Sequence, residues 1–566
     1  MLLWAALFAF SLVLLGRIAY WQLIRRDELR SLGELEHYQP QSLQPRRGQI
    51  LDRHGAVLAT DLFTYEVAAS PSQVADPEAL AQEMALWLGQ SEGKLWEQLL
   101  ADQPSVTLAR QVPPDTASAI ASLGHPEITL WPAPTRTYPE GDLAAHLLGF
   151  VGGDNRGLYG LEAHYDRVLV GQAGSRGSSE DPSGVAAAVR FGAYIPATDG
   201  PSLILTLDRT LQKLVEEELQ AGLDASGAEA GTIVALEPAT GKVLAMASRP
   251  AYDGNRYYLA EPQERYVDPA VSQVYEPGSV YKLVTMAAAL DSGLVTPNDT
   301  YEDSGSIRVG GQLIYNWDYS ARGTVTMTEL IQHSLNVGAA TLSTNMGWET
   351  FYHYVRRFGF AEVAGIDLDG EVPGLVKVPG DPDWYEADLG TNAFGQGIAV
   401  TPLQMAASAA AVANQGILMR PYIVDRIIWP DGTTSQIEPL VRRRVLEADS
   451  ARALSAMLVA SGGGETSLAR IPGYAAAGKT GTAQIPIPGG YDPQGTIASF
   501  VGYLPADEPQ ILILVVLVRP TASPWGSVVA APVFRAIAER AVAYLGIPPD
   551  DVRLRLRAEA AGFDGG

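Results

Sequence analysis

The chain has 566 residues, of which 47% are hydrophobic and 18% charged, and its formal net charge is −24 at pH 7. This length exceeds one ordinary hydrophobic core, so two or three globular units are expected, and the composition is that of folded protein. The negative charge argues against a nucleic-acid partner, because phosphate binding needs a basic surface. The chain has no cysteine, which excludes disulfides, thiolate metal sites and cysteine nucleophiles. Its histidines lack metal-ligand spacing, so neither a metal nor a cofactor is predicted.

The N-terminus is apolar. Residues 1–16 carry no charge, and residues 18–24 extend the run past Arg17. About 23 such residues suit one membrane-spanning helix, so we predict an anchor at residues 1–25 that leaves the rest of the chain outside the cytoplasm. A cleaved signal peptide is the alternative, and no Ala-x-Ala-like site supports it. The basic residues follow the span rather than precede it, which by the positive-inside rule alone would reverse the orientation. A chain that starts further upstream, with a short basic tail, would remove this conflict.

Residues 26–200 are predicted to form a β-rich spacer without catalytic residues. Within them, residues 47–59 alternate around an Asp-Arg-His-Gly turn and predict a β-hairpin. Residues 76–100 have helical spacing of apolar side chains. Residues 175–184 are rich in Gly, Ser and Asp and predict a mobile loop. None of these segments brings a nucleophile close to a base.

From residue 201 the pattern changes to long helices and buried strands. An α+β domain at residues 201–548 is predicted, followed by a C-terminal tail at residues 549–566, because sheet strands lie at both ends of this region with helices between them. The predicted strands are residues 232–236, 243–247, 475–483, 497–503 and 511–518, and the predicted flanking helices are residues 211–219 and 528–545.

Ser279 is the candidate nucleophile. Pro277 and Gly278 mark the end of a loop, and the apolar run at residues 283–290 predicts a buried helix that ends near Ser292. Lys282 lies three residues after Ser279, on the same helical face. Burial lowers the pKa of a lysine, and only the neutral amine can accept the serine proton. A second Ser-x-x-Lys pattern begins at Ser91, but it lies in a charged segment with no buried helix after it.

Three motifs carry a resemblance to a known family. Ser279-x-x-Lys282, Ser334-Leu335-Asn336 and Lys479-Thr480-Gly481-Thr482 resemble, in this order, the motifs of the penicillin-binding proteins and serine β-lactamases. Ser343-Thr344-Asn345 also matches the middle motif. Ser334 is preferred because it lies between two predicted helical segments.

Further segments are similar to class B penicillin-binding proteins: residues 47–53, the segment around 138–139, and residues 160–162, 394–397 and 401–404. The resemblance implies a membrane helix, an extended β-rich pedestal (the dimerisation domain of class B) and a C-terminal transpeptidase domain of the penicillin-binding and β-lactamase type. The latter would have a five-stranded sheet sandwiched by helices. Two features favour the division type, penicillin-binding protein 3 or FtsI, over the elongation type, penicillin-binding protein 2: Asn336-Val337-Gly338 and the Tyr-Glu-Pro-Gly-Ser lead-in at residues 275–279.

The resemblance implies D,D-transpeptidation of peptidoglycan stem peptides that end in D-Ala-D-Ala, and acylation by β-lactams. Ser279 would attack, Lys282 would take its proton, and Ser334 would relay a proton to the leaving amine. Asn336 would hold the substrate amide and Lys282. Lys479 would supply a positive charge, and Thr480 and Thr482 would bind the terminal carboxylate of the substrate. Gly481 would let the substrate lie close to the strand. The backbone N–H groups of Ser279 and Thr482 would form the oxyanion hole.

The resemblance also suggests a SEDS glycosyltransferase of the FtsW or RodA kind as partner, together with proteins of the division or elongation complex. A non-catalytic protein that senses β-lactams or acts as a scaffold is the alternative of another class, and the intact nucleophile, base and oxyanion strand argue against it. A carboxypeptidase would differ only in using water as the acceptor. The sequence leaves open the acceptor amine, the stem-peptide chemistry and the oligomeric state.

Overall fold

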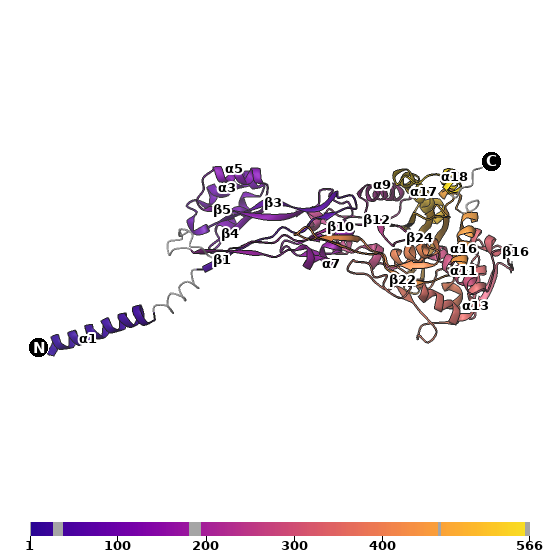
Figure 1. Ribbon diagram of the computed structural model, residues 1–566, viewed down its shortest axis with the longest axis horizontal. Helices are drawn as coiled ribbons and strands as arrows, with labels where there is room; N and C mark the ends of the chain where they lie inside the picture. The colour runs from indigo at the N-terminus through magenta and orange to yellow at the C-terminus, as the bar shows by residue number, and fades with distance from the viewer. Residues whose placement is uncertain (1, 26–37, 180–193, 462–465, 561–566) are drawn as a thin grey trace. The chain divides into compact units, whose positions relative to one another are not determined.

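The computed structural model describes residues 2–25, 38–179, 194–461 and 466–560 (Figure 1). The chain forms two compact units, and neither is continuous in sequence. The first unit comprises Met1–Gly48, Asp61–Thr135 and Val170–Pro201, and the second comprises Gln49–Thr60, Arg136–Leu169 and Ser202–Gly566.

The N-terminal segment is helical. Helix α1 spans Leu2–Ala19, and a π-helical turn, η1, follows at Tyr20–Ile24. None of the helices in the described part of the chain combines the length and the apolar character needed to cross a membrane. The predicted anchor at residues 1–25 is therefore not confirmed.

The first unit has a small core between strands and helices. Strand β3 (Val57–Ala69) pairs with β4 (Val106–Val112) and β5 (Ile128–Thr137), and the buried side chains of this group include Val67, Met84 and Leu95. The helices are α3 (Pro77–Leu88), α4 (Glu92–Leu99) and α5 (Pro114–Ser122). The single helical segment predicted at residues 76–100 is thus two helices, because Gly89 adopts a left-handed φ of +63° and ends α3.

A second, three-stranded sheet of this unit is formed by β1 (Tyr38–Leu43), β8 (Gly174–Ser179) and β9 (Tyr194–Ile195). Strand β8 occupies the first half of the segment predicted as a mobile loop. Its backbone pairs antiparallel with β1 from Gly174 to Ser179, which the polar composition does not reveal. Residues 180–184 of that prediction lie outside the described residues.

The predicted hairpin at residues 47–59 is confirmed. Strand β2 (Ile50–Leu51) pairs antiparallel with the start of β3, and Gly55 in the turn has a φ of +86°. The Asp52 carboxylate accepts hydrogen bonds from the backbone N–H groups of His54 and Ala56, which closes the turn. Strand β10 (Ser202–Leu205) continues this sheet parallel to β2 and antiparallel to β20 (Val424–Ile428).

The second unit is built on a five-stranded sheet, as predicted. The sheet is antiparallel, and its strands lie in the order β12-β11-β25-β24-β23. It joins strands from both ends of the unit's sequence, and β23 is an edge strand. The strands are β11 (Ala230–Leu236), β12 (Val243–Arg249), β23 (Ala477–Ile487), β24 (Gly490–Leu504) and β25 (Ile511–Val518).

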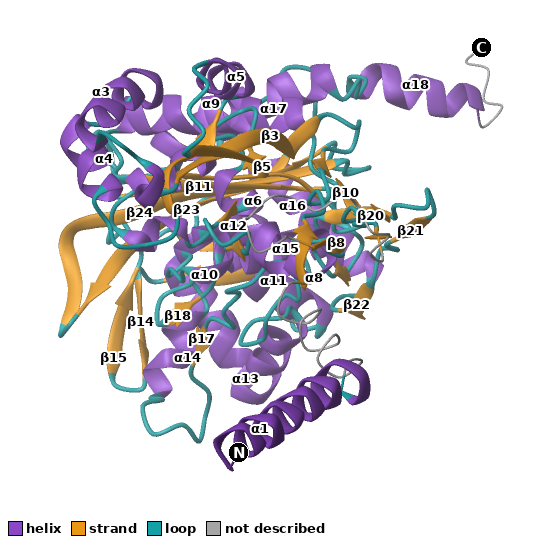
Figure 2. Ribbon diagram, turned by 90° about the vertical axis from the view of Figure 1, so that its left-hand side faces the viewer, coloured by secondary structure: helices purple, strands orange, loops and turns teal. Residues whose placement is uncertain are grey.

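Both faces of this sheet are buried. In β25, Ile513 and Val515 belong to one core and Leu512 and Leu514 to the other, as the two-residue period of a strand requires. Figure 2 shows α9 and α17 on one side of the orange strands and α11 and α15 on the other. These helices are α9 (Arg209–Ser226), α17 (Gly526–Tyr544), α11 (Lys282–Asp291) and α15 (Pro402–Ala413).

Other elements of the second unit lie around this three-layered centre. The ones used below are η5 (Gly278–Tyr281), β15 (Gln312–Tyr315), α12 (Met327–Gln332), α13 (Asn336–Arg357), α14 (Glu386–Asn392) and α18 (Asp550–Ala560). The region predicted as a C-terminal tail therefore contains a helix, and residues 561–566 lie outside the described residues.

Candidate active site

Ser279 lies in the tight turn η5, a 3₁₀ helix that continues directly into α11. Side chains three residues apart eclipse one another in 3₁₀ geometry, and the Lys282 Nζ atom is 2.9 Å from the Ser279 Oγ atom. Gly278 has a φ of +58°, and a Cβ atom there would lie 2.5 Å from the Thr482 carbonyl oxygen. The turn therefore requires glycine at this position, immediately before the candidate nucleophile.

Lys282 connects the first two motifs. Its side chain is buried, and Nζ donates to the Ser334 carbonyl at 2.5 Å, the Ser334 hydroxyl at 3.1 Å and the Asn336 Oδ1 atom at 2.7 Å. Ser334 adopts a left-handed φ of +52° in the connection between α12 and α13. Asn336 is the first residue of α13, and its amide nitrogen donates to the Tyr315 carbonyl at 3.1 Å. Ser279, Ser334 and Asn336 thus all contact the Lys282 amine.

The third motif lies on the edge strand β23. Lys479 is 2% exposed, and its Nζ atom donates to the Thr480 hydroxyl at 3.1 Å. The Thr482 hydroxyl accepts a hydrogen bond of 3.1 Å from the Gly526 N–H, at the start of α17. The side chain of Lys479 is therefore buried beside Thr480 rather than exposed on the strand.

The packing around residue 481 requires glycine, which the sequence does not reveal. A Cβ atom there would lie 2.3 Å from Ser499 Oγ and 2.9 Å from the Pro277 carbonyl oxygen. The missing side chain thus faces β24 and the turn that carries Ser279, so glycine lets the strand and the turn approach each other.

One cleft of about 760 Å³ is lined by five of the predicted residues, Ser279, Ser334, Asn336, Thr480 and Thr482. Lys282, Lys479 and Gly481 are not among its lining residues. Two exposed tryptophans, Trp317 and Trp525, also line this cleft, with their ring centroids 5.2 Å apart. Tyr281 is different: it is fully buried and packs against Phe360. Of these aromatic residues only the tryptophans can contact a ligand in the cleft.

The structure adds a carboxylate that the motifs do not include. Glu276 is buried, and its Oε1 atom accepts hydrogen bonds from the Gly397 N–H at 2.9 Å and the Tyr491 hydroxyl at 3.3 Å. Burial raises the pKa of Glu276 above its usual value. The Gly278 N–H donates to the Gly395 carbonyl at 3.0 Å, so the segment around Gly395 braces the nucleophile turn. The signal in the sequence is an acidic residue immediately before Pro-Gly at the start of an apolar helix.

The competing motif matches have structural roles. Ser91 is the N-cap of α4, and Lys94 is exposed. Ser343 lies inside α13, fully buried, and its hydroxyl donates to the Leu389 carbonyl at 2.7 Å. Ser279 and Ser334 line the cleft, whereas Ser91 and Ser343 are not among its lining residues.

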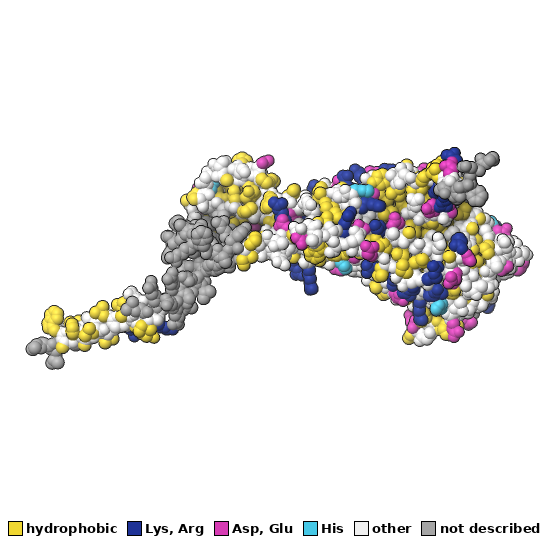
Figure 3. Space-filling model, viewed as in Figure 1, with side chains coloured by type: hydrophobic (Ala, Val, Ile, Leu, Met, Phe, Trp, Pro, Cys, Tyr) yellow, Lys and Arg dark blue, Asp and Glu magenta, His cyan; other side chains and the backbone are white. Residues whose placement is uncertain are grey.

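Several charged side chains outside the cleft form ion pairs, such as Arg249 with Glu216 and Arg519 with Asp492. Basic and acidic side chains are interspersed on the face drawn in Figure 3. Across the described ranges, no three His, Cys, Asp or Glu side chains are grouped in a way that could hold a metal ion. The Ser279 hydroxyl, the buried Lys282 amine and the edge strand β23 of the sheet together form a candidate serine–lysine site.

Comparison with known proteins identifies the family. Residues 231–539 match the penicillin-binding protein transpeptidase domain, and residues 42–205 match the penicillin-binding protein dimerisation domain. The chain is 33% identical to stage V sporulation protein D of Bacillus subtilis, over 95% of this chain and 84% of that one. It is also 33% identical to the peptidoglycan D,D-transpeptidase FtsI of Escherichia coli, over 95% of this chain and 90% of that one.

The solved structures agree. Penicillin-binding protein 3 of Mycobacterium tuberculosis, in complex with aztreonam, superposes with a TM-score of 0.71 at 28% identity and covers 90% of this chain and 98% of that one. The chain therefore belongs to the penicillin-binding protein family, with a dimerisation domain followed by a transpeptidase domain. This confirms the family predicted from the three motifs.

Proposed function

We propose that this chain is a peptidoglycan D,D-transpeptidase that cross-links stem peptides through an acyl-enzyme on Ser279. The observation that carries the proposal is the 2.9 Å contact between the Lys282 amine and the Ser279 hydroxyl, in a buried polar cluster at the cleft. A serine is a weak nucleophile unless a base takes its proton, and the amine is within reach to do so.

In the acylation step the Ser279 Oγ atom attacks the carbonyl carbon of the penultimate D-Ala, and its proton passes to Lys282. Ser334 delivers a proton to the nitrogen of the terminal D-Ala, which leaves as the free amino acid. The hydroxyl of Ser334 is 3.1 Å from Lys282 Nζ, so one short relay joins the base to the leaving group. A positioned base of this kind contributes roughly 10²–10⁴-fold to the rate.

The strand β23 is suited to hold the peptide donor. As an edge strand it can accept an added strand from the substrate by main-chain hydrogen bonds, with Thr480 and Thr482 in the cleft beside the terminal carboxylate. Lys479, a buried residue of the same strand, supplies positive charge. The Thr482 backbone approaches Gly278 closely, which supports an oxyanion hole made by the N–H groups of Ser279 and Thr482.

Deacylation completes the reaction when an amine of a second stem attacks the ester carbonyl and the proton returns through Lys282 to Ser279. Water in place of the amine would make the enzyme a carboxypeptidase. The two outcomes are separated by incubating the protein with a donor peptide ending in D-Ala-D-Ala and an amine acceptor.

Mass spectrometry should then show free D-Ala together with the donor–acceptor conjugate, and Ser279→Ala should form neither. Hydrolysed donor without conjugate would instead favour the carboxypeptidase. No release of D-Ala by folded wild-type protein would favour the sensing or scaffolding alternative.

β-Lactams should acylate Ser279 by the same chemistry, because their strained amide takes the place of the donor carbonyl. The penicillin-binding protein 3 structure named above contains aztreonam, which makes a monobactam a suitable first probe.

The cellular role that we propose is septal wall synthesis, based on the FtsI relative and on Asn336-Val337-Gly338; elongation is the alternative. We further propose a SEDS glycosyltransferase of the FtsW or RodA kind as partner, an anchor at residues 1–25, a pedestal at residues 26–200 and a catalytic domain at residues 201–548. Rescue of a strain depleted of its division transpeptidase would test the role. Retention in carbonate-washed membranes would test the anchor.

A further inference from the structure

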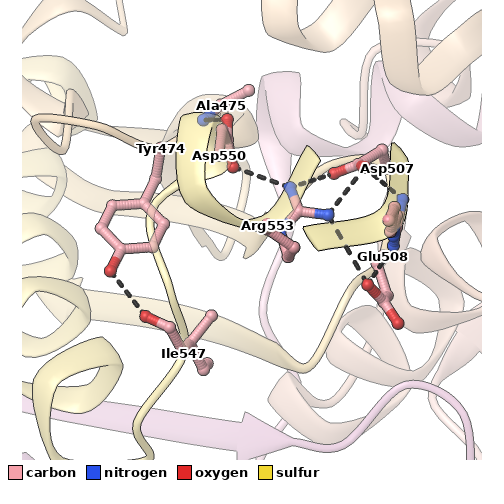
Figure 4. Close-up of polar contacts among 8 residues, drawn as sticks. Tyr474, Ala475, Asp507, Glu508, Ile547, Asp550 and Arg553 are labelled. Carbon is pink, nitrogen blue, oxygen red and sulfur yellow. Dashed lines mark hydrogen bonds and ion pairs between the residues drawn. The ribbon is translucent and has the colours of Figure 1, made fainter. Parts of the chain in front are cut away.

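We propose that helix α18 positions the edge strand β23 for catalysis, with Asp550 and Arg553 as positioning residues. This inference rests on the proposed function and adds to it, because these residues are remote in sequence from all three motifs. Figure 4 shows the contacts, which join α18 to the segment before β23 and to the turn between β24 and β25.

The first set of contacts fixes the segment that leads into β23. The Ala475 N–H donates to Asp550 Oδ2 at 2.6 Å, and the Asp550 N–H donates to the Gly473 carbonyl at 2.9 Å. The Tyr474 hydroxyl donates to the Ile547 carbonyl at 2.7 Å, just before the helix. Residues 473, 474 and 475 therefore each form one hydrogen bond with the chain at or just before the start of α18.

The second set fixes the turn between β24 and β25. The Arg553 guanidinium donates to both carboxylate oxygens of Asp507, at 2.7 and 2.5 Å, and also to Asp550 Oδ1 at 2.7 Å. Arg553 is only 6% exposed, whereas the Asp507 side chain is 42% exposed, so the guanidinium side of this bidentate pair is shielded from water. One guanidinium thus connects the turn with the same Asp550 carboxylate that holds Ala475.

A third contact joins the turn directly to the segment before β23. The Ala506 N–H, next to Asp507, donates to the Ala475 carbonyl at 2.9 Å. Ala475 is therefore held on its N–H side by α18 and on its carbonyl side by the turn, and α18 holds the turn. These three segments restrain one another at the start of β23.

This restraint matters because β23 is an edge strand, with a hydrogen-bonded neighbour strand, β24, on one side. Lys479 follows Ala475 by four residues, or roughly 13 Å of extended chain, so a shift at the start of the strand is transmitted to the motif. A misplacement of about 1 Å at a catalytic site can cost about 10²-fold in rate. A helix that only stabilised the fold would instead change the melting temperature and leave the rate of the folded protein unchanged.

The test measures acylation by a fluorescent penicillin in the full chain, with the binding constant Kd separated from the acylation rate k2. The variants are Asp550→Ala, Arg553→Gln and the milder Asp507→Asn. Arg555→Gln is the matched control, because Arg555 is an exposed arginine of the same helix. Leu219→Ala controls for stability, because Leu219 is a fully buried residue of α9 and packs beside β11, away from the β23 edge.

We expect k2 to fall about tenfold in Asp550→Ala and Arg553→Gln and less in Asp507→Asn, with little change in Kd, since positioning acts on the transition state. Amide exchange of residues 475–484 should quicken in the same variants. Arg555→Gln should keep the wild-type k2, and Leu219→Ala should keep it despite a lower melting temperature. Wild-type k2 in the first two variants, or an equal loss in Leu219→Ala, would overturn this inference alone. A folded wild-type protein that forms no adduct would overturn the proposed function and this inference with it.

Discussion

Gly481→Ala is expected to separate the nucleophile turn from β23. The new Cβ atom would lie 2.3 Å from Ser499 Oγ, 2.9 Å from the Pro277 carbonyl oxygen and 2.9 Å from Val280 Cγ1. The serine hydroxyl can rotate away, but the Pro277 carbonyl belongs to the backbone two residues before Ser279. Relief of the clash therefore requires the strand and the turn to move apart by a few tenths of an ångström or more.

Overpacking of a dense core costs about 1–3 kcal/mol, so the melting temperature should fall by a few degrees. The effect on acylation should be larger, up to about 10²-fold in k2, because the displaced backbone carries the nucleophile. The assay is the time course of labelling by a fluorescent penicillin, together with thermal unfolding.

Gly153→Ala is the matched control, because a Cβ atom at Gly153 meets no other atom within 4 Å. This reasoning would be refuted by a folded Gly481→Ala protein that is labelled at the wild-type rate.

Three further substitutions test other contacts. Asn336→Asp places a carboxylate 2.7 Å from Lys282 Nζ and stabilises the ammonium form, so the pH profile of acylation should move to higher pH, as measured by k2 against pH. Burial raises the pKa of Glu276 from 4.5, so the folded state holds its proton more tightly; the contribution of Glu276 to stability is therefore greatest at low pH and is lost as the pH rises above 4.5, and Glu276→Gln should remove this contribution from the pH profile of the melting temperature. Glu162→Gln leaves the Arg136 guanidinium, whose Nε atom lies 2.6 Å from Glu162, buried without its carboxylate, and should cost about 3–5 kcal/mol in urea unfolding; a loss below 1 kcal/mol would contradict the importance of this pair.

The central sheet was predictable because its strands are buried on both faces. Residues 511–518 form an unbroken apolar run that matches β25 residue for residue, since a strand between two helix layers has no polar face. The same holds for α11, whose apolar run starts at the turn marked by Pro277 and Gly278. In these segments local composition and tertiary environment agree.

The predictions of secondary structure were wrong where the sequence is polar or where the conformation of a single residue decides where a helix ends. Strand β8 consists of Gly, Ser and Arg, and its pairing with β1 depends on a partner more than 130 residues away in sequence. The division of residues 76–100 into two helices depends on the left-handed conformation of Gly89 alone. Helix α18 has a charged sequence, and the ion pairs of Arg553 that hold it come from a distant turn.

The residues of the candidate site could be proposed from the sequence, but the contacts that hold them in place could not. The motifs supplied Ser279, Lys282, Ser334, Asn336 and the residues of β23, because a resemblance in spacing identifies residue types. The hydrogen bonds of Glu276 and the packing role of Gly481 could not be found in this way, since both depend on which backbone atoms meet across the fold.

The most direct test of the account is to locate the β-lactam adduct. The protein and its Ser279→Ala variant would be treated with a penicillin, weighed intact by mass spectrometry and then digested to map the modified peptide. The account predicts one adduct per chain, on the peptide that contains Ser279, and none in a folded Ser279→Ala protein. An adduct on another residue, or an equal adduct in the variant, would contradict the assignment of Ser279 as the nucleophile.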